Sequence, residues 1–330
     1  MFLKAYVDFI KVRGLPMRFS GSDMRLLQVF VAVVEHGGFA AAEGELNLSP
    51  STISNHMSAL EERLGMRLCQ RGRRGFRLTE EGQSVYAAAA RLDTALADFT
   101  SEVGEVQGRI GGDLKIGLVD AVSGDPNNRL HEVLARLRTR APRLGISLSQ
   151  ERPQELQSRV RDGAFHCGIG AFLHQIDGLV HQPLYFEDHG LYCARAHPFF
   201  GQEDDRITAD MLNGAPYVHR GYWREEDTRA HGFANVQATV YQIEPQFMLI
   251  RTGHYIGFLP HHFAEPWVAA GDLRAIAPAR HRYRARFDLI LPRGQRHTAA
   301  LREFLRAVDE VWRGVDAEGM AEQGNRILPG

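Results

Sequence analysis

LSPSTISNHMSALEERL, residues 48–64, decides the fold of the N-terminal part of the chain. Ser49 can cap a helix with its hydroxyl, and proline loses no hydrogen bond at a first helical position, so we expect a helix to begin at Pro50. The apolar residues of this helix recur at spacings of four, three and four and form one stripe, which consists of Ile53, Met57, Leu60 and Leu64. The opposite face carries short polar side chains. Such a face suits close approach to DNA, although an ordinary solvated face has the same composition.

Two further helices are predicted before this stretch. Residues Asp23–Glu35 show the apolar spacing of an amphipathic helix, and His36-Gly37-Gly38 ends it. Phe39–Leu46 is rich in alanine and predicts a short second helix, which a tight turn at Asn47–Ser49 joins to the helix at Pro50. This succession is typical of a helix-turn-helix.

Residues 66–78, MRLCQRGRRGFRL, contain five arginines and no acidic residue. Two short extended runs around Gly72 and Gly75 predict a β-hairpin wing. A charged run is usually a solvated surface, but directly after a helix-turn-helix it favours a phosphate clamp. The residues predicted to contact DNA are Phe39, Ser49, Pro50, Ser51, Thr52, Ser54, Asn55, His56, Arg71, Arg73, Arg74 and Arg77.

A long helix is predicted to follow the wing and to run to about Gly104. Its apolar residues repeat at alternating spacings of four and three, which is the seam of a coiled coil. The polar residues between them exclude burial on all sides, so we expect a partner helix and therefore a dimer. The predicted dimerisation residues are Val85, Ala89, Leu92, Leu96, Phe99 and Val103.

Many positions between residues 23 and 82 match one known pattern, and these are Leu27, Phe30, Val34, Gly38, Phe39, Ala41, Ala42, Leu46, Ser49, Ser51, Ile53, Ser54, Leu60, Glu61, Leu64, Gly65, Leu68, Arg71, Leu78, Thr79 and Gly82. With these residues the segment resembles the DNA-binding domain of LysR-type transcriptional regulators. The resemblance implies an α/β protein overall, with an N-terminal all-α winged helix-turn-helix, a coiled-coil linker helix and a two-lobed effector-binding domain similar to periplasmic binding proteins. It also implies promoter or operator DNA, a small-molecule effector and RNA polymerase as partners, and dimers that pair into tetramers.

Three positions depart from that family pattern. The family often has glutamine where Pro50 and His56 stand, and a basic residue where Asn55 stands. Base preference therefore does not carry over from a relative.

The predicted organisation places a glycine-rich boundary, GRIGGD, at Gly108–Asp113. Beyond it, strands alternate with helices, which indicates βαβ units and a parallel sheet. One of these helices is expected from Pro126 to Arg140, with Asp125 as its cap. The predicted parts are an N-terminal extension at 1–21, the DNA-binding domain at 22–79, the linker helix at 80–108, the effector-binding domain at 112–315 and a tail at 316–330. By resemblance, lobe I comprises 113–182 and 285–315, and lobe II comprises 183–284.

An effector is expected beyond the carboxyl ends of the strands and beside helix N-termini. This rule selects Asp120, Ser123, Ala171, Phe172, His219, Tyr222, Gln242 and Glu244. Ser123 fits a ligand donor and an ordinary turn serine equally well. Because Asp120 and Asp125 would repel an anion, the sequence favours a polar or aromatic effector beside Phe172 and Tyr222.

Several other functions have weak support in the sequence. The chain has 330 residues, a formal charge of -1 and ordinary hydrophobic content, so any nucleic-acid site must be a local patch. His261 and His262 lack cysteine or carboxylate partners at ligand spacing, so we expect neither a metal nor a cofactor. Cys167 and Cys193 lie in predicted strands and are expected to be buried rather than reactive.

Two other functions are alternatives to a regulator. An enzyme with a catalytic C-terminal domain would need a motif such as Gly-x-Ser-x-Gly or HExxH, and the sequence has neither. An architectural DNA-binding protein would have an unresponsive second domain. The apolar start of the chain is interrupted by Lys4, Asp8 and Lys11, so it predicts neither a signal peptide nor a membrane span, and we expect a cytoplasmic protein.

Overall fold

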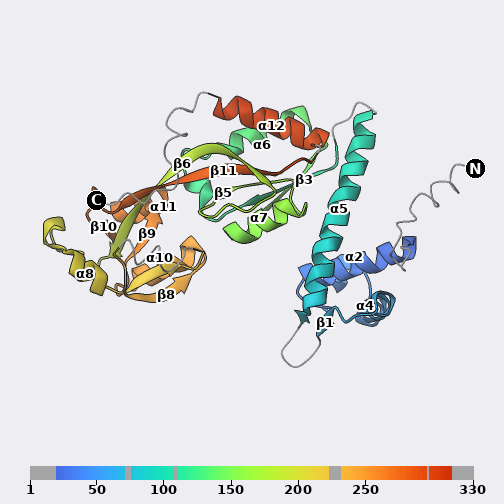
Figure 1. Cartoon of the computed structure of the whole chain (residues 1–330), viewed down its shortest axis with the longest axis horizontal. Helices are drawn as coiled ribbons and strands as arrows, with labels where there is room; N and C mark the ends of the chain where they lie inside the picture. The colour runs from blue at the N-terminus through green and yellow to red at the C-terminus, as the bar shows by residue number, and fades with distance from the viewer. Residues whose placement is uncertain (1–19, 71–75, 107–110, 223–231, 296, 314–330) are drawn as a thin grey trace, which may run out of the picture. The chain divides into compact units, whose positions relative to one another are not determined.

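The structure is a computed structural model that describes residues 20–70, 76–106, 111–222, 232–295 and 297–313. The chain forms two compact units, Met1–Asp93 and Thr94–Gly330, and each is described by itself (Figure 1). None of the helices in the described ranges is long and apolar enough to cross a membrane.

The first unit is built on α2 (Gly21–Glu35) and α4 (Pro50–Leu64), which pack on each other. Ser20 and Asp23 form a reciprocal capping box at the start of α2. Helix α4 begins at Pro50 with Ser49 as its cap, as the sequence predicts. The predicted stripe is confirmed as well, because Ile53, Met57 and Leu60 are fully buried and Leu64 packs against the same core.

The second helix is shorter than predicted. Residues 39–42 form turns, and only α3 (Glu43–Leu46) is helical. The two glycines before this segment have positive φ, and irregular hydrogen bonds such as that from Glu43 N–H to the Ala40 carbonyl replace the regular helical pattern. The helix-turn-helix therefore has a one-turn middle element.

The base of the predicted wing is a two-stranded antiparallel ladder. Strands β1 (Cys69–Gln70) and β2 (Arg77–Leu78) pair Cys69 with Leu78. The predicted tip, with Arg71, Arg73 and Arg74, lies outside the described residues. Helix α5 (Glu80–Val106) follows β2 directly.

The second unit contains a seven-stranded mixed sheet. Three neighbouring strands at one end of the sheet are parallel, as predicted, and are β5 (Cys167–Ala171), β3 (Asp113–Leu118) and, at the edge, β4 (Gly145–Gln150). The others are antiparallel to their neighbours, and are β6 (Leu179–Ala194), β9 (Gly257–Pro260), β10 (Leu273–Ala275) and β11 (Arg282–Pro292). Figure 1 shows α6 (Leu130–Arg140) and α12 (Ala299–Trp312) over one face and α7 (Pro153–Arg161) over the other.

Strands β6 and β11 run through both lobes. The first half of β6 pairs with the second half of β11 beside β5, and its second half carries β9 and β10. The expected lobe boundaries, 182/183 and 284/285, thus fall inside continuous strands. Their register shifts between Phe287 and Asp288, where Leu184 of β6 is left without a partner in the ladder.

The second lobe also contains a separate two-stranded parallel sheet. It consists of β7 (Tyr217–Arg220) and β8 (Val236–Val240), with helices α8 (Ala209–Gly214), α10 (Ile243–Arg251) and α11 (His261–Ala269) and the short turn η2 (Asp204–Arg206). The sequence also predicts a helix near Arg224 to His231, and this segment lies outside the described residues.

The predicted helix start at Pro126 is wrong. Residues Val122–Gly124 form the 3₁₀ turn η1, and α6 begins only at Leu130. Asp125 is not a helix cap, because its carboxylate accepts the N–H of Asn127, while Asn128 accepts the N–H of Leu130. This local turn competes with the helix and delays it by four residues.

Candidate functional site

The exposed face of α4 carries the polar residues predicted to meet DNA. Ser49, Pro50, Ser51 and Asn55 are exposed, and Ser49 accepts the N–H of Thr52. The remaining predicted residues of this helix are half-buried, and these are Thr52, Ser54 and His56. Phe39 is also half-buried and packs edge-on against Phe76, with ring centroids 6.0 Å apart. The arrangement leaves the first turns of α4 open to a ligand.

Glu61, on the buried side of α4, fixes the base of the wing. Its carboxylate accepts the N–H of Leu68 at 2.9 Å and forms an ion pair with Arg67 at 3.0 Å. Gly82 of α5 passes so close that a Cβ there would lie 1.9 Å from the Leu68 carbonyl oxygen. Helix α4, the base of the wing and the start of α5 therefore share one junction, and Arg77 of β2 is exposed beside it in the sequence.

The predicted dimerisation residues divide into two groups. Val85 and Ala89 pack against the core of the first unit. The other four are exposed, with fractions of 38% for Leu92, 45% for Leu96, 65% for Phe99 and 43% for Val103. Four large apolar side chains on one helix stripe favour a partner surface.

The second unit holds a pocket where the two lobes meet. Its volume is about 70 Å³. Lobe I, lobe II and the two long strands all contribute to its wall, which consists of Val119, Asp120, Pro153, Ala171, Leu173, Glu187, His189, Arg220, Tyr222, Ile243, Pro260, Tyr283, Ala285 and Phe287.

Arg220, at the end of β7, is the cation of this pocket. Its guanidinium is buried and donates to Gln246 Oε1 at 2.9 Å, to the hydroxyl of Tyr222 at 3.1 Å and to the carbonyl of Phe258 at 3.1 Å. In the described part of the chain no carboxylate forms an ion pair with it. A buried arginine remains charged, so the pocket presents a positive charge held in place by neutral partners.

Asp120, at the end of β3, faces the pocket from the other lobe. Its Oδ2 accepts the backbone N–H of Ile243 at the start of α10. Burial raises the pKa of Asp120. The hydrogen bond from Ile243 and the charge of Arg220 lower this pKa, but burial has the larger effect. The carboxylate thus links the lobes and adds a negative charge to the pocket wall.

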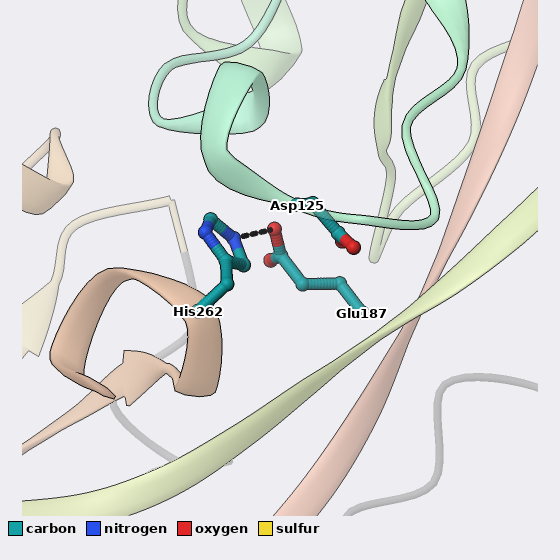
Figure 2. A group of neighbouring side chains, drawn as sticks. All are labelled: Asp125, Glu187 and His262. Carbon is teal, nitrogen blue, oxygen red and sulfur yellow. Dashed lines mark hydrogen bonds and ion pairs between the residues drawn. The ribbon is translucent and has the colours of Figure 1, made fainter. Parts of the chain in front are cut away.

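Glu187 of β6 is the centre of a second polar group beside the pocket (Figure 2). Its oxygens meet His189 Nε2 at 2.6 Å and His262 Nε2 at 3.0 Å. Burial alone would raise the pKa of Glu187, but the two histidines lower it below the usual value. Burial lowers the pKa of His189, so we assign a neutral imidazole that donates to an ionised Glu187.

Asp125 completes this group. Its Oδ2 is buried without a hydrogen-bond partner among the described residues. Asp125, Glu187 and His262 each place one oxygen or nitrogen within 4.8 Å of the others, which is a donor set that suits a divalent cation. Burial, with a further contribution from Glu187, raises the pKa of Asp125 against the hydrogen bond from Asn127.

Asp125→Asn should therefore stabilise the chain at pH 7.5. Folding raises the pKa of the Asp125 carboxyl above the value of about 4 that it has in the unfolded chain. The ionised carboxylate therefore destabilises the folded state at neutral pH, and this destabilisation disappears as the pH falls toward 4. We expect a gain of about 1 kcal/mol at pH 7.5 that shrinks toward pH 4, measured by thermal unfolding in EDTA. Exposed Asp177→Asn is the control, with no expected change. A lower melting temperature for Asp125→Asn at pH 7.5 would contradict this account.

Three of the eight residues predicted to bind an effector line the pocket, namely Asp120, Ala171 and Tyr222. The other five lie elsewhere. Ser123 is exposed in η1, and Gln242 and Glu244 are exposed at the start of α10. Phe172 is buried against His181, and His219 is buried in β7.

The sequence argument missed Arg220, Glu187, His189 and Tyr283. Arg220 could have been found, because it follows His219 at the carboxyl end of a predicted strand. Side chains alternate between the two faces of a strand, so only one of these two residues can face the pocket. The others do not lie at the carboxyl ends of β6 and β11, so a rule based on carboxyl ends cannot select them.

The three cysteines are buried and form no disulfide, and burial was predicted for Cys167 and Cys193. Burial raises the pKa of the Cys167 thiol and raises that of Cys193 to about 12. Neither is therefore a thiolate at neutral pH.

Two family models match the chain. Residues 24–83 match "Bacterial regulatory helix-turn-helix protein, lysR family", and residues 107–313 match "LysR substrate binding domain". Among curated proteins, the HTH-type transcriptional activator BauR of Pseudomonas aeruginosa is 40% identical over 290 residues, which are 88% of this chain and 95% of that protein.

Solved structures show the same fold. The structure of CbnR, a LysR family transcriptional regulator, matches with a TM-score of 0.58 at 20% identity. The match covers 88% of this chain and 99% of the CbnR chain. Full-length CbnR in complex with its target DNA matches with a TM-score of 0.59 at 22% identity, and this match covers 87% of this chain and 98% of the CbnR chain.

Proposed function

The chain belongs to the LysR family of transcriptional regulators, and from that membership we propose that it reads an operator with α4 and the wing and responds to a small molecule bound around Arg220. The family consists of DNA-binding regulators with an effector-binding domain. An enzyme with a catalytic C-terminal domain finds no support in it.

The exposed polar turns of α4 support the DNA-reading role. Ser49, Ser51 and Asn55 project from the N-terminal end of a helix whose opposite face is locked in a core. Backbone N–H groups and hydroxyls there suit phosphate, and asparagine can pair with the edge of adenine. Arg77 and the arginines predicted at the wing tip supply contacts that do not depend on sequence.

The observation that carries the effector role is the pocket itself. A buried cation, Arg220, and a carboxylate, Asp120, approach one cavity from different lobes. A ligand that contacts both of these residues connects the two lobes. Its affinity therefore depends on how the lobes are arranged, which is the requirement for control by a ligand.

We extend the proposal to assembly and location. The exposed part of the α5 stripe supports a dimer, and pairing of dimers into tetramers is a further step of the same proposal. We also propose that the protein contacts RNA polymerase and is located in the cytoplasm.

Footprinting on the DNA upstream of the gene tests this function, with two variants that should differ in kind. Asn55→Ala should lose about 1–3 kcal/mol of discrimination at specific operator bases and little affinity for random DNA. Arg77→Ala should weaken binding to specific and random DNA alike and reduce the salt slope by about 1. Absence of salt-sensitive binding to this DNA would contradict the proposal, and equal losses for Asn55→Ala on both DNAs would remove its base-reading role.

A further inference from the structure

Resting on the proposed function, we infer that the effector is a small amino-acid zwitterion whose carboxylate faces Arg220 and whose ammonium faces Asp120. The inference uses the signs of the charges in the pocket, the partners they already have and the size of the cavity.

The carboxylate end is selected by Arg220 and Tyr222. All hydrogen-bond acceptors that the described structure gives Arg220 are neutral, since they are an amide, two phenols and a carbonyl. A carboxylate in the pocket would supply the charge-assisted contact that this guanidinium lacks. Tyr222 already accepts an N–H from Arg220, which orients its own O–H to donate to the same anion.

The ammonium end is selected by the carboxylates of the wall. Asp120 uses Oδ2 to accept from Ile243, and Glu187 lies in the same wall with its charge held by two histidines. With His189 neutral, the ionised groups lining the pocket are one cation and two anions. A dicarboxylate would add two negative charges to a wall that is already negative, whereas a zwitterion adds none and meets an opposite charge at each end.

The size of the pocket restricts the zwitterion to a short one. Its volume of about 70 Å³ is less than half of the roughly 150 Å³ of a cavity that admits benzene. The apolar parts of the wall, such as Val119, Ala171 and Ile243, suit a few methylene groups between the charged ends. Of the polar or aromatic effector that the sequence favours, the aromatic form is too large for this cavity.

Calorimetric titration of the full chain with matched ligands tests the inference. The set is glycine, 3-aminopropanoate and 4-aminobutanoate, compared with propanoate, propylamine and succinate, all in EDTA so that no cation occupies the Asp125 group. At least one amino acid should bind at least tenfold more tightly than propanoate, propylamine and succinate. Asp120→Asn, which keeps an acceptor for Ile243, should reduce that affinity at least tenfold and leave propanoate unchanged. Exposed Glu244→Gln, on the same helix start, is the control and should change neither.

Each other outcome overturns the inference. Propanoate, propylamine or succinate binding as tightly as every amino acid would exclude recognition of two opposite charges, and so would an Asp120→Asn variant that binds amino acids normally. Failure of all six ligands at 10 mM would exclude this ligand class. In each case the proposed function survives if the footprint on upstream DNA responds to another metabolite, and it fails separately if no such DNA binding exists.

Discussion

Arg220→Gln should abolish the effector response while DNA binding persists. Removing the guanidinium eliminates the one cation that lines the described pocket, and it leaves the Phe258 carbonyl and Gln246 without their charged donor. Loss of one partner from a buried charged contact costs about 3 kcal/mol or more, so we expect the dissociation constant to rise at least about 100-fold. Calorimetry with the tightest ligand and a footprint with and without it measure the two effects.

Two variants separate this effect from loss of folding. Arg220→Lys keeps the charge but loses the planar fork, so it should bind with intermediate affinity and an almost unchanged melting temperature. Arg284→Gln removes an exposed arginine of β11, paired with Asp188, and should alter neither affinity nor footprint. An Arg220→Gln protein that is folded and responds normally would show that the effector does not use this cation.

Glu61→Ala should unfold the first unit under conditions in which the second remains folded. The change strands the backbone N–H of Leu68 in a buried position, weakens the support of Cys69 and removes the ion pair with Arg67. Hydrogen bonds to a charged acceptor contribute about 1.5–3 kcal/mol each, so we expect a loss of about 4 kcal/mol from a domain whose total stability is of order 5–15 kcal/mol.

The distribution of tryptophan makes this prediction easy to measure. All three tryptophans, Trp223, Trp267 and Trp312, belong to the second unit. In urea, Glu61→Ala should therefore shift the loss of DNA binding and part of the circular dichroism to lower denaturant, with tryptophan fluorescence unchanged. Glu62→Ala, one position along and exposed, should stay within about 0.5 kcal/mol of the parent. Coincident shifts of all three signals would contradict the assignment of Glu61 to the first unit alone.

The first unit was largely predictable because its signals are local. A cap and proline at Ser49-Pro50 and an apolar stripe from Ile53 to Leu64 determine α4 from within its own seventeen-residue neighbourhood. The short α3 was overpredicted, since alanine propensity is a weak term where the preceding glycines already set the chain direction.

The effector pocket was less predictable because its charges come from distant parts of the chain. The two aspartates at 120 and 125 suggested repulsion of anions, and no argument from neighbouring residues places Arg220 opposite Asp120. Glu187 and His262 are also 75 positions apart, and only the packing of α11 against β6 and β9 brings them together. Local periodicity carries no information about such pairs.

The two long strands connect the lobes and also line the proposed effector pocket. Glu187 and His189 on β6, and Tyr283, Ala285 and Phe287 on β11, put a large part of the pocket wall on the elements that join the lobes. A paired ribbon resists bending in its plane but yields readily to torsion, more so beside the unpaired Leu184. A ligand in the proposed pocket would contact the strands that connect the lobes, so we expect it to alter the twist of this ribbon rather than a separate hinge.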